Sequence, residues 1–250
     1  MKNNNKSENF KEKLKQALAS TARVISGDIS LGEDLSQNKS SKKFDFFNLE
    51  NLNSKNDFIK ARADSDSLAL KKKFSNDKIF RKNLPSGSSS KTLYSIAEKI
   101  RYESLGSQML QGIKKNLHDN YNQIISFKRK DQLKSKEDVP LIEAFELYML
   151  KKFHGIRLNS LTEKMLNFWE KDFDKAVEKH IDFLKEKLEF QDDYSSKFSE
   201  ILQEMDILQN EENEETKEEN QNEGQNNPSN DDQNNENEDE KDQKKDEETE

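Results

Sequence analysis

The 250-residue sequence contains no cysteine, which excludes disulfides, cysteine-ligated zinc or iron–sulfur sites, and cysteine nucleophiles. Apolar residues are also scarce, since 30% of the chain is hydrophobic and 37% is charged. No apolar run approaches the roughly 18 residues that a membrane-spanning helix needs, and segment 1–13 lacks the apolar stretch of a secretion signal. We therefore expect a cytoplasmic protein without a membrane partner.

The C-terminal part of the sequence lacks every large apolar side chain. Residues 209–250 contain no Leu, Ile, Val, Phe, Met, Trp or Tyr, so burial cannot offset the entropy of ordering them. This segment holds four of the 42 basic and 18 of the 50 acidic residues, a net charge of −14 against +6 for the rest. We predict a helical domain over residues 1–208, followed by a disordered acidic segment that screens the domain from nucleic acid.

Apolar residues recur with the 3.6-residue period of amphipathic helices through most of residues 1–208. Gly27 and Gly155 follow two of these patterns in the position typical of a helix C-terminus. Residues 29–31 and 43–49 alternate instead, which predicts one small β-ribbon near the N-terminus. The predicted fold is mainly α, an irregular helical domain with helices over residues 10–25, 57–74, 88–117, 140–155, 161–188 and 193–208.

The helix predicted over residues 88–117 has two unusual features. Ser88, Ser89 and Ser90 are candidate N-caps, and Gly106 and Gly112 each cost about 1 kcal/mol relative to alanine within a helix. The glycines imply either a break into two helices or the close approach of another element.

The polar face of the same helix carries Glu98 three residues before Arg101, within ion-pair reach. We interpret this pair as a salt bridge on a solvated surface, because exposed pairs of this kind are common and contribute little.

Two short motifs come close to known sites without matching them. The run GSSSKT at residues 87–92 has Pro85 and Ser90 where a phosphate-binding loop requires glycine. The run ADSDSL at residues 63–68 is similar to an Asp-x-Ser-x-Ser metal motif, but Asp66 replaces the first serine. We interpret both runs as ordinary loop and helix positions. The basic run Lys128–Lys136 includes Asp131 and reads as a solvated loop rather than a nucleic-acid patch.

The histidines His118, His154 and His180 are too far apart in sequence for the paired spacing typical of helical metal sites. His154 precedes Gly155 and is expected at a helix C-terminus, where a cation interacts well with the helix dipole, and His180 is expected to pack. We predict no catalytic, cofactor-binding or metal residues in this chain.

Two segments resemble the N-terminal region of the CobT subunit family of aerobic cobaltochelatase. They are ADSDSLAL at Ala63–Leu70 and IRYESLGSQMLQGIKKNL at Ile100–Leu117, in the family's order and at comparable spacing, with weaker likeness from Phe10 to about Leu208. The resemblance implies a helical region, an acidic linker and a C-terminal von Willebrand factor A domain. Residues 1–250 contain no such domain, so we expect the sequence to be the N-terminal part of a longer protein.

The resemblance further implies a non-catalytic assembly and coupling subunit of ATP-dependent cobaltochelatase, which inserts Co²⁺ into hydrogenobyrinic acid a,c-diamide. Its implied partners are a CobS-type AAA+ ATPase and a CobN-type large subunit. The complex uses ATP, Mg²⁺ and Co²⁺, whereas this chain alone is expected to bind none of them and to be inactive. Arg101, Tyr102 and Met109 are the candidate partner-docking residues, because these residue types are enriched at interfaces.

Two other classes of protein stay open. One is a stand-alone acidic-tailed adaptor or chaperone, whose binding would be sensitive to salt and would require the acidic segment. The other is an enzyme with carboxylate and histidine ligands dispersed over helix faces, which requires Glu-x-x-His pairs. Such pairs are lacking, because the residues three positions before the histidines are Lys115, Lys151 and Val177.

Overall fold

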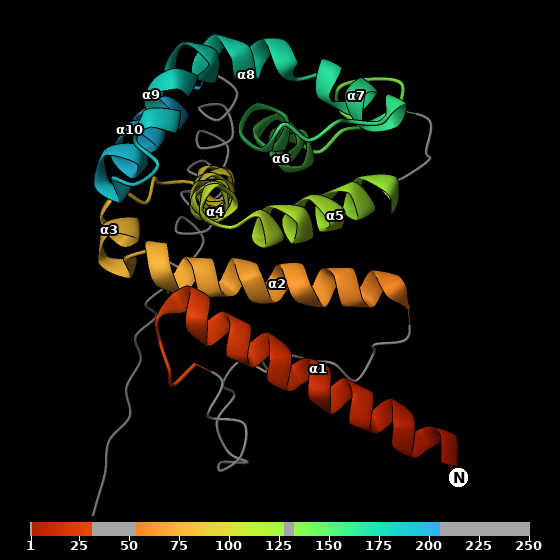
Figure 1. Cartoon of the computed structure of the whole chain (residues 1–250). Helices are drawn as coiled ribbons and strands as arrows, with labels where there is room; N and C mark the ends of the chain where they lie inside the picture. The colour runs from red at the N-terminus through yellow and green to blue at the C-terminus, as the bar shows by residue number, and fades with distance from the viewer. Residues whose placement is uncertain (1, 32–53, 128–132, 206–250) are drawn as a thin grey trace, which may run out of the picture. The chain divides into compact units, whose positions relative to one another are not determined.

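The computed structural model describes residues 2–31, 54–127 and 133–205, and every regular element within these ranges is helical (Figure 1). The prediction of a mainly α fold is therefore confirmed. The predicted β-ribbon is wrong in its first strand, because residues 29–31 form a turn after the first helix. Its second strand, residues 43–49, and the acidic segment 209–250 lie outside the described residues.

The first two helices, α1 (Lys2–Ser26) and α2 (Lys55–Phe74), pack along each other (Figure 1). As predicted, α1 ends at Gly27, whose backbone has a φ of +73°, a conformation that glycine adopts without a steric penalty. The start of α2 is fixed by a capping box that the sequence analysis did not identify. Ser54 Oγ accepts a hydrogen bond from the Asp57 N–H at 3.3 Å, and the Asp57 carboxylate accepts one from the Ser54 N–H at 2.7 Å.

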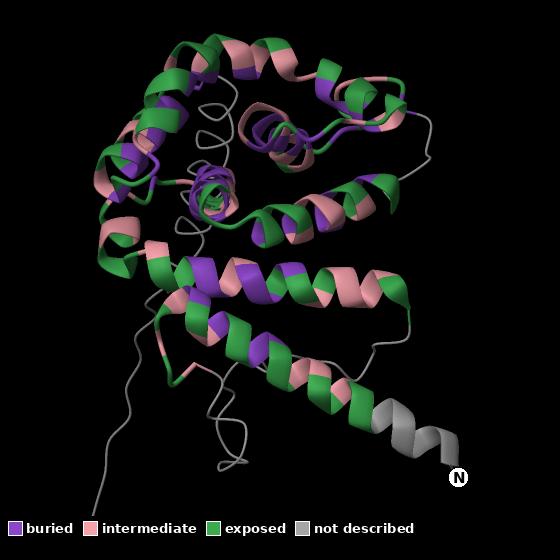
Figure 2. Ribbon diagram, in the orientation of Figure 1, coloured by how far each residue is buried: buried purple, intermediate pink, exposed green. Residues whose placement is uncertain are grey.

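The helix α4 (Ser88–Met109) is the centre of the fold, preceded by the short helix α3 (Asp77–Lys82) and followed by α5 (Gln111–Phe127). It contacts α2, α5, α6 and α10, and Figure 2 shows it as the most continuously buried helix. Its N-cap residue is Gly87, which makes no side-chain capping bond, so the predicted serine caps are wrong. The serines lie within the first turn instead.

The C-terminal half wraps around α4 in an arc of short helical segments (Figure 1). It begins with α6, for which Pro140 is the N-cap, and continues through a π-helical turn that ends, as predicted, at Gly155. The segments are α6 (Leu141–Met149), η2 (Leu150–His154), α7 (Ser160–Asn167), α8 (Glu170–Val177), η3 (Glu178–His180), α9 (Ile181–Glu186) and α10 (Gln191–Gln203).

The single helix predicted over residues 161–188 is thus divided into α7, α8 and α9. The first break lies at Trp169, whose indole N–H donates to the Val139 carbonyl oxygen at 3.0 Å. A straight helix of this length would carry its apolar stripe away from a compact core. The breaks let the chain curve, so that Phe173, Leu184 and, from α10, Phe198 are all fully buried.

Candidate functional site

The junction of α4 and α5 shows both alternatives that we predicted from the two glycines, a helix break and the close approach of another helix. The chain leaves the helix at Leu110, whose backbone is extended and whose N–H still donates to the Gly106 carbonyl oxygen at 3.0 Å. A Cβ atom at Gly106 would lie 2.4 Å from two methyl carbons of Leu70, so α2 approaches α4 closely here. A Cβ atom at Gly112 would meet nothing within 4 Å. Gly106 therefore permits the close approach, whereas the helix breaks at Leu110.

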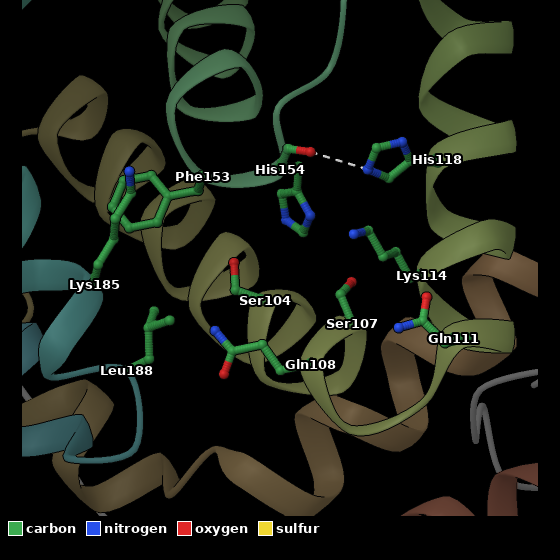
Figure 3. Close-up of a pocket in the computed structure, with 10 residues that line it drawn as sticks. All are labelled: Ser104, Ser107, Gln108, Gln111, Lys114, His118, Phe153, His154, Lys185 and Leu188. Atoms are coloured by element: carbon green, nitrogen blue, oxygen red, sulfur yellow. Dashed lines mark hydrogen bonds between the residues drawn. The ribbon is translucent and has the colours of Figure 1, made fainter.

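A pocket of about 320 Å³ opens beside this junction (Figure 3). The segment that resembles the CobT family supplies half of its lining, and His118 follows directly in α5. These residues are Ser104, Ser107, Gln108, Gln111, Lys114 and His118. The opposite wall comes from the C-terminal half and consists of Phe153, His154, Lys185 and Leu188.

The charges that line the pocket are all positive. Neither Lys114 nor Lys185 forms an ion pair with another described residue, although the Lys185 ammonium lies 5.9 Å from the centre of the Phe153 ring. No aspartate or glutamate is among the lining residues. The adjacent Lys115 differs, because its ammonium pairs with Asp119 at 3.2 Å. The lining therefore carries two ammonium groups and no carboxylate.

His154 is 8% exposed and is one of the buried lining residues, together with Ser104 and Leu188. Burial, followed by the nearby charges of His118, Lys99 and Lys114, lowers the pKa of His154 to about 4. The imidazole is therefore neutral at pH 7. His154 does end a helical turn, but the expectation that it acts there as a cation is wrong, because burial disfavours the charged form.

Several polar atoms of the pocket have no hydrogen-bond partner within the described protein: Ser104 Oγ, Ser107 Oγ and His154 Nε2. His118 is held differently, since its Nε2 lies 3.0 Å from the His154 carbonyl oxygen. Because a carbonyl oxygen only accepts, His118 carries its proton on Nε2. The pocket thus presents fixed polar groups with unused hydrogen-bonding capacity.

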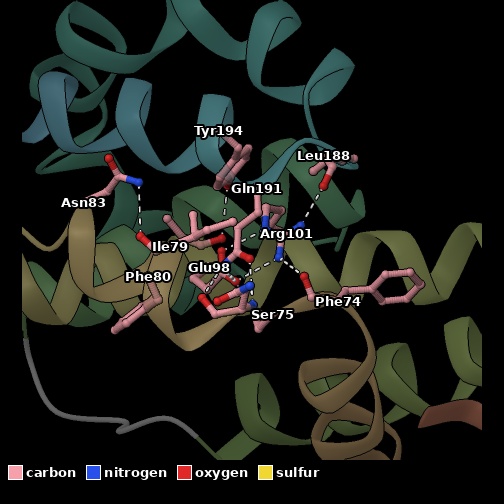
Figure 4. Close-up of polar contacts among 12 residues, drawn as sticks. Phe74, Ser75, Ile79, Phe80, Asn83, Glu98, Arg101, Leu188, Gln191 and Tyr194 are labelled. Atoms are coloured by element: carbon pink, nitrogen blue, oxygen red, sulfur yellow. Dashed lines mark hydrogen bonds and ion pairs between the residues drawn. The ribbon is translucent and has the colours of Figure 1, made fainter. Parts of the chain in front are cut away.

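The predicted docking residue Arg101 lies in the interior, with 1% of its surface exposed. Its Nε donates to Glu98 Oε2 at 2.8 Å, and Nη1 and Nη2 donate to the carbonyl oxygens of Leu188 and Phe74 at 2.7 and 2.6 Å (Figure 4). Glu98 also accepts from Gln191 Nε2 at 3.0 Å. The network joins the end of α2, the middle of α4 and the turn before α10.

This network corrects two predictions. The Glu98–Arg101 pair is a buried salt bridge rather than a surface one, and Tyr102 is only 7% exposed. The expectation that Arg101 and Tyr102 lie on an exposed docking face is therefore wrong, because segments distant in sequence cover that face. Met109 is 43% exposed, and its role in docking stays a prediction.

The two segments that carry the resemblance contact each other inside the domain, which sequence reasoning missed. Ser67 Oγ donates to Glu103 Oε1 at 2.6 Å, and Asn116 Nδ2 donates to Asp66 Oδ2 at 2.8 Å. Burial raises the pKa of both carboxyl groups, Glu103 and Asp66. The ADSDSL run thus lies in α2 as predicted, and its polar side chains link α2 to α4 and α5.

The described ranges therefore define a helical domain with an apolar core, buried polar contacts between its helices and a basic polar pocket beside its central junction. Within them, no group of three or more His, Asp or Glu residues is placed to hold a metal ion, and no helix is long and apolar enough to cross a membrane. The chain belongs to the CobT family, since the model of cobalamin biosynthesis protein CobT matches residues 8–250. No solved structure matches the chain. Membership of this family assigns the protein to cobalamin biosynthesis.

Proposed function

We propose that this chain is a non-catalytic assembly and coupling subunit of ATP-dependent cobaltochelatase, which inserts Co²⁺ into hydrogenobyrinic acid a,c-diamide. The observation that carries the proposal is the CobT family match over residues 8–250. In this scheme a CobS-type AAA+ ATPase uses ATP and Mg²⁺, a CobN-type large subunit holds the corrin, and Co²⁺ is a substrate of the complex. The chain described here contributes binding surfaces.

The burial pattern indicates where such surfaces can lie. Polar side chains of the two resembling segments, Asp66, Arg101 and Glu103, are buried and bonded inside the domain, so they are unavailable to a partner without unfolding. The end of α4 differs, since Met109 and Leu110 are adjacent apolar residues that are 43% and 48% exposed. We place partner docking at Met109, with Leu110 beside it.

A pull-down of the chain with the CobS-type and CobN-type proteins from the same source, at moderate and at high salt, tests this function. Capture that withstands high salt is expected, together with ATP-dependent cobalt insertion that requires the chain. Met109→Glu should weaken capture by about tenfold or more, because it places a charge in an apolar contact. Val24→Glu is the matched control, since Val24 is 82% exposed on α1, a helix that packs on α2.

Each outcome decides one part of the proposal. If both partners stay in solution and cobalt insertion proceeds equally well without the chain, the proposed function is wrong. If capture is normal but Met109→Glu and Val24→Glu behave alike, docking lies elsewhere on the chain. Capture that disappears both at high salt and on removal of the acidic segment would favour the adaptor alternative, in which carboxylates alone attract a basic partner.

A further inference from the structure

The pocket beside the α4–α5 junction has a charged mouth and an uncharged polar floor. Lys114 and Lys185 are exposed and lie on opposite sides of it. In Figure 3 the Lys114 ammonium points toward the His154 ring, and Ser104 and Ser107 lie below that ring in this view. We propose that this pocket binds an oxyanion group, a carboxylate or a phosphate, of a small molecule.

The donor set favours an oxyanion over other ligands. Two serine hydroxyls and an imidazole can each give a hydrogen bond to the same oxygen-bearing group, and two lysines balance its charge. A metal cation would be repelled by Lys114 and Lys185 and would find no carboxylate ligand in the lining. An apolar ligand would leave Ser104 Oγ, Ser107 Oγ and His154 Nε2 buried without hydrogen-bond partners, which is unfavourable.

The volume of the pocket limits the size of its ligand. At about 320 Å³ it lies at the lower end of small-molecule sites, which span roughly 300–1,000 Å³. It therefore suits a compact molecule with one to three oxyanion groups, such as inorganic phosphate or citrate. The same chemistry is available from the carboxylates of the chain's own acidic segment, which carries 18 of them, so the experiment must separate these two sources.

The pKa of His154 can report whether an anion is bound in the pocket. The groups that face it are His118, Lys114 and Tyr121 from α5 and Lys99 from α4, with Lys185 across the pocket from α9. None of these supplies a negative charge, because burial raises the pKa of the Tyr121 hydroxyl well above its ordinary value. An anion bound beside the imidazole would stabilise its protonated form and raise the pKa of His154 from about 4.

The test is an NMR titration of the histidine rings in the full chain. Spectra are recorded in chloride, inorganic phosphate or citrate at equal ionic strength, and His154→Gln identifies the His154 signals. Phosphate or citrate should raise the pKa of His154 by about one unit or more, with an apparent Kd below about 1 mM. His180, which lies on η3 outside the pocket, should titrate alike in all three salts.

Two variants distinguish the pocket from a general attraction to positive charge. Lys114→Met should weaken the response of His154 by about tenfold. Lys115→Met should leave it unchanged, because Lys115 is paired with Asp119 and does not line the pocket. A peptide of residues 209–250, added at equal carboxylate concentration, should produce no comparable shift.

Three results would overturn the assignment. The first is a pKa of His154 that stays unchanged at about 10 mM probe, ten times the expected limit of Kd. The second is an equal pKa shift at His180. The third is an equal loss of the His154 response in Lys114→Met and Lys115→Met. A pKa shift of His154 produced by the acidic peptide, but not by phosphate or citrate, would mean that the pocket binds carboxylates of the chain's own acidic segment instead of a small molecule. Because the isolated chain is used, failure here leaves the cobaltochelatase proposal intact, and failure of subunit capture leaves the pocket intact.

Discussion

Gly106→Ala tests whether the close packing of α2 on α4 sets the fold at the central junction. The added methyl group would lie 2.4 Å from both Leu70 methyl carbons and 2.9 Å from Leu70 Cγ, well inside van der Waals contact. Leu70 is fully buried, so it can move only by disturbing its neighbours. Overpacking of this kind costs about 1–3 kcal/mol, whereas alanine gains about 1 kcal/mol over glycine in a helix. We expect a net loss on the order of 1 kcal/mol.

Gly112→Ala is the matched control, because it lies in α5 with nothing within 4 Å of its added methyl group. It should stabilise the protein by up to about 1 kcal/mol through helix propensity alone. Urea denaturation followed by the fluorescence of Trp169, the single tryptophan, gives the free energy of unfolding of each variant.

A double-mutant cycle with Leu70→Ala completes the test. The Leu70→Ala substitution alone should cost about 2–5 kcal/mol, because it leaves a cavity in the core. In that background the added methyl group of Gly106→Ala no longer meets the Leu70 methyl carbons and the substitution should become stabilising, so the two effects are not additive. If Gly106→Ala is as favourable as Gly112→Ala in the natural sequence, or if the two substitutions add simply, the inferred clash does not exist.

Two further predictions follow from the buried polar groups. Arg101→Met leaves the Glu98 carboxylate buried without its cationic partner and should lower the free energy of unfolding by about 3–5 kcal/mol. Lys60→Met, which breaks an exposed pair with Asp64, should lower it by under about 1 kcal/mol in the same urea assay. Similar losses of stability in the two variants would contradict the buried network. For His154, the folded pKa of about 4 lies below the ordinary 6.5, so the unfolded chain binds the proton more readily. The contribution of the neutral His154 to the free energy of unfolding is complete above pH 6.5 and is lost as the pH falls toward 4. The total loss is roughly 3 kcal/mol, at about 1.4 kcal/mol per pH unit. His154→Gln should reduce this pH dependence of stability, and an unchanged slope would refute the assignment.

The sequence alone determined the features that depend on local interactions. The helical period placed α1, α2 and α4, and the glycines at positions 27 and 155 marked two helix ends, because a backbone with positive φ favours glycine whatever surrounds it. The two segments Ala63–Leu70 and Ile100–Leu117 were sufficient to indicate the CobT family, and the family match confirmed it. Each of these features can be recognised from a short stretch of neighbouring residues.

The tertiary structure alone decided which polar residues are accessible. Arg101 looked like part of a solvated face, yet it bonds to the carbonyl oxygens of Phe74 and Leu188, which are 27 and 87 positions away in the chain. The same holds for the pocket, whose two walls come from segments on either side of residues 128–132. Local periodicity describes which residues share a helix face, but what covers that face depends on packing between distant segments. That is why the helices could be predicted, whereas the buried network and the basic pocket could not.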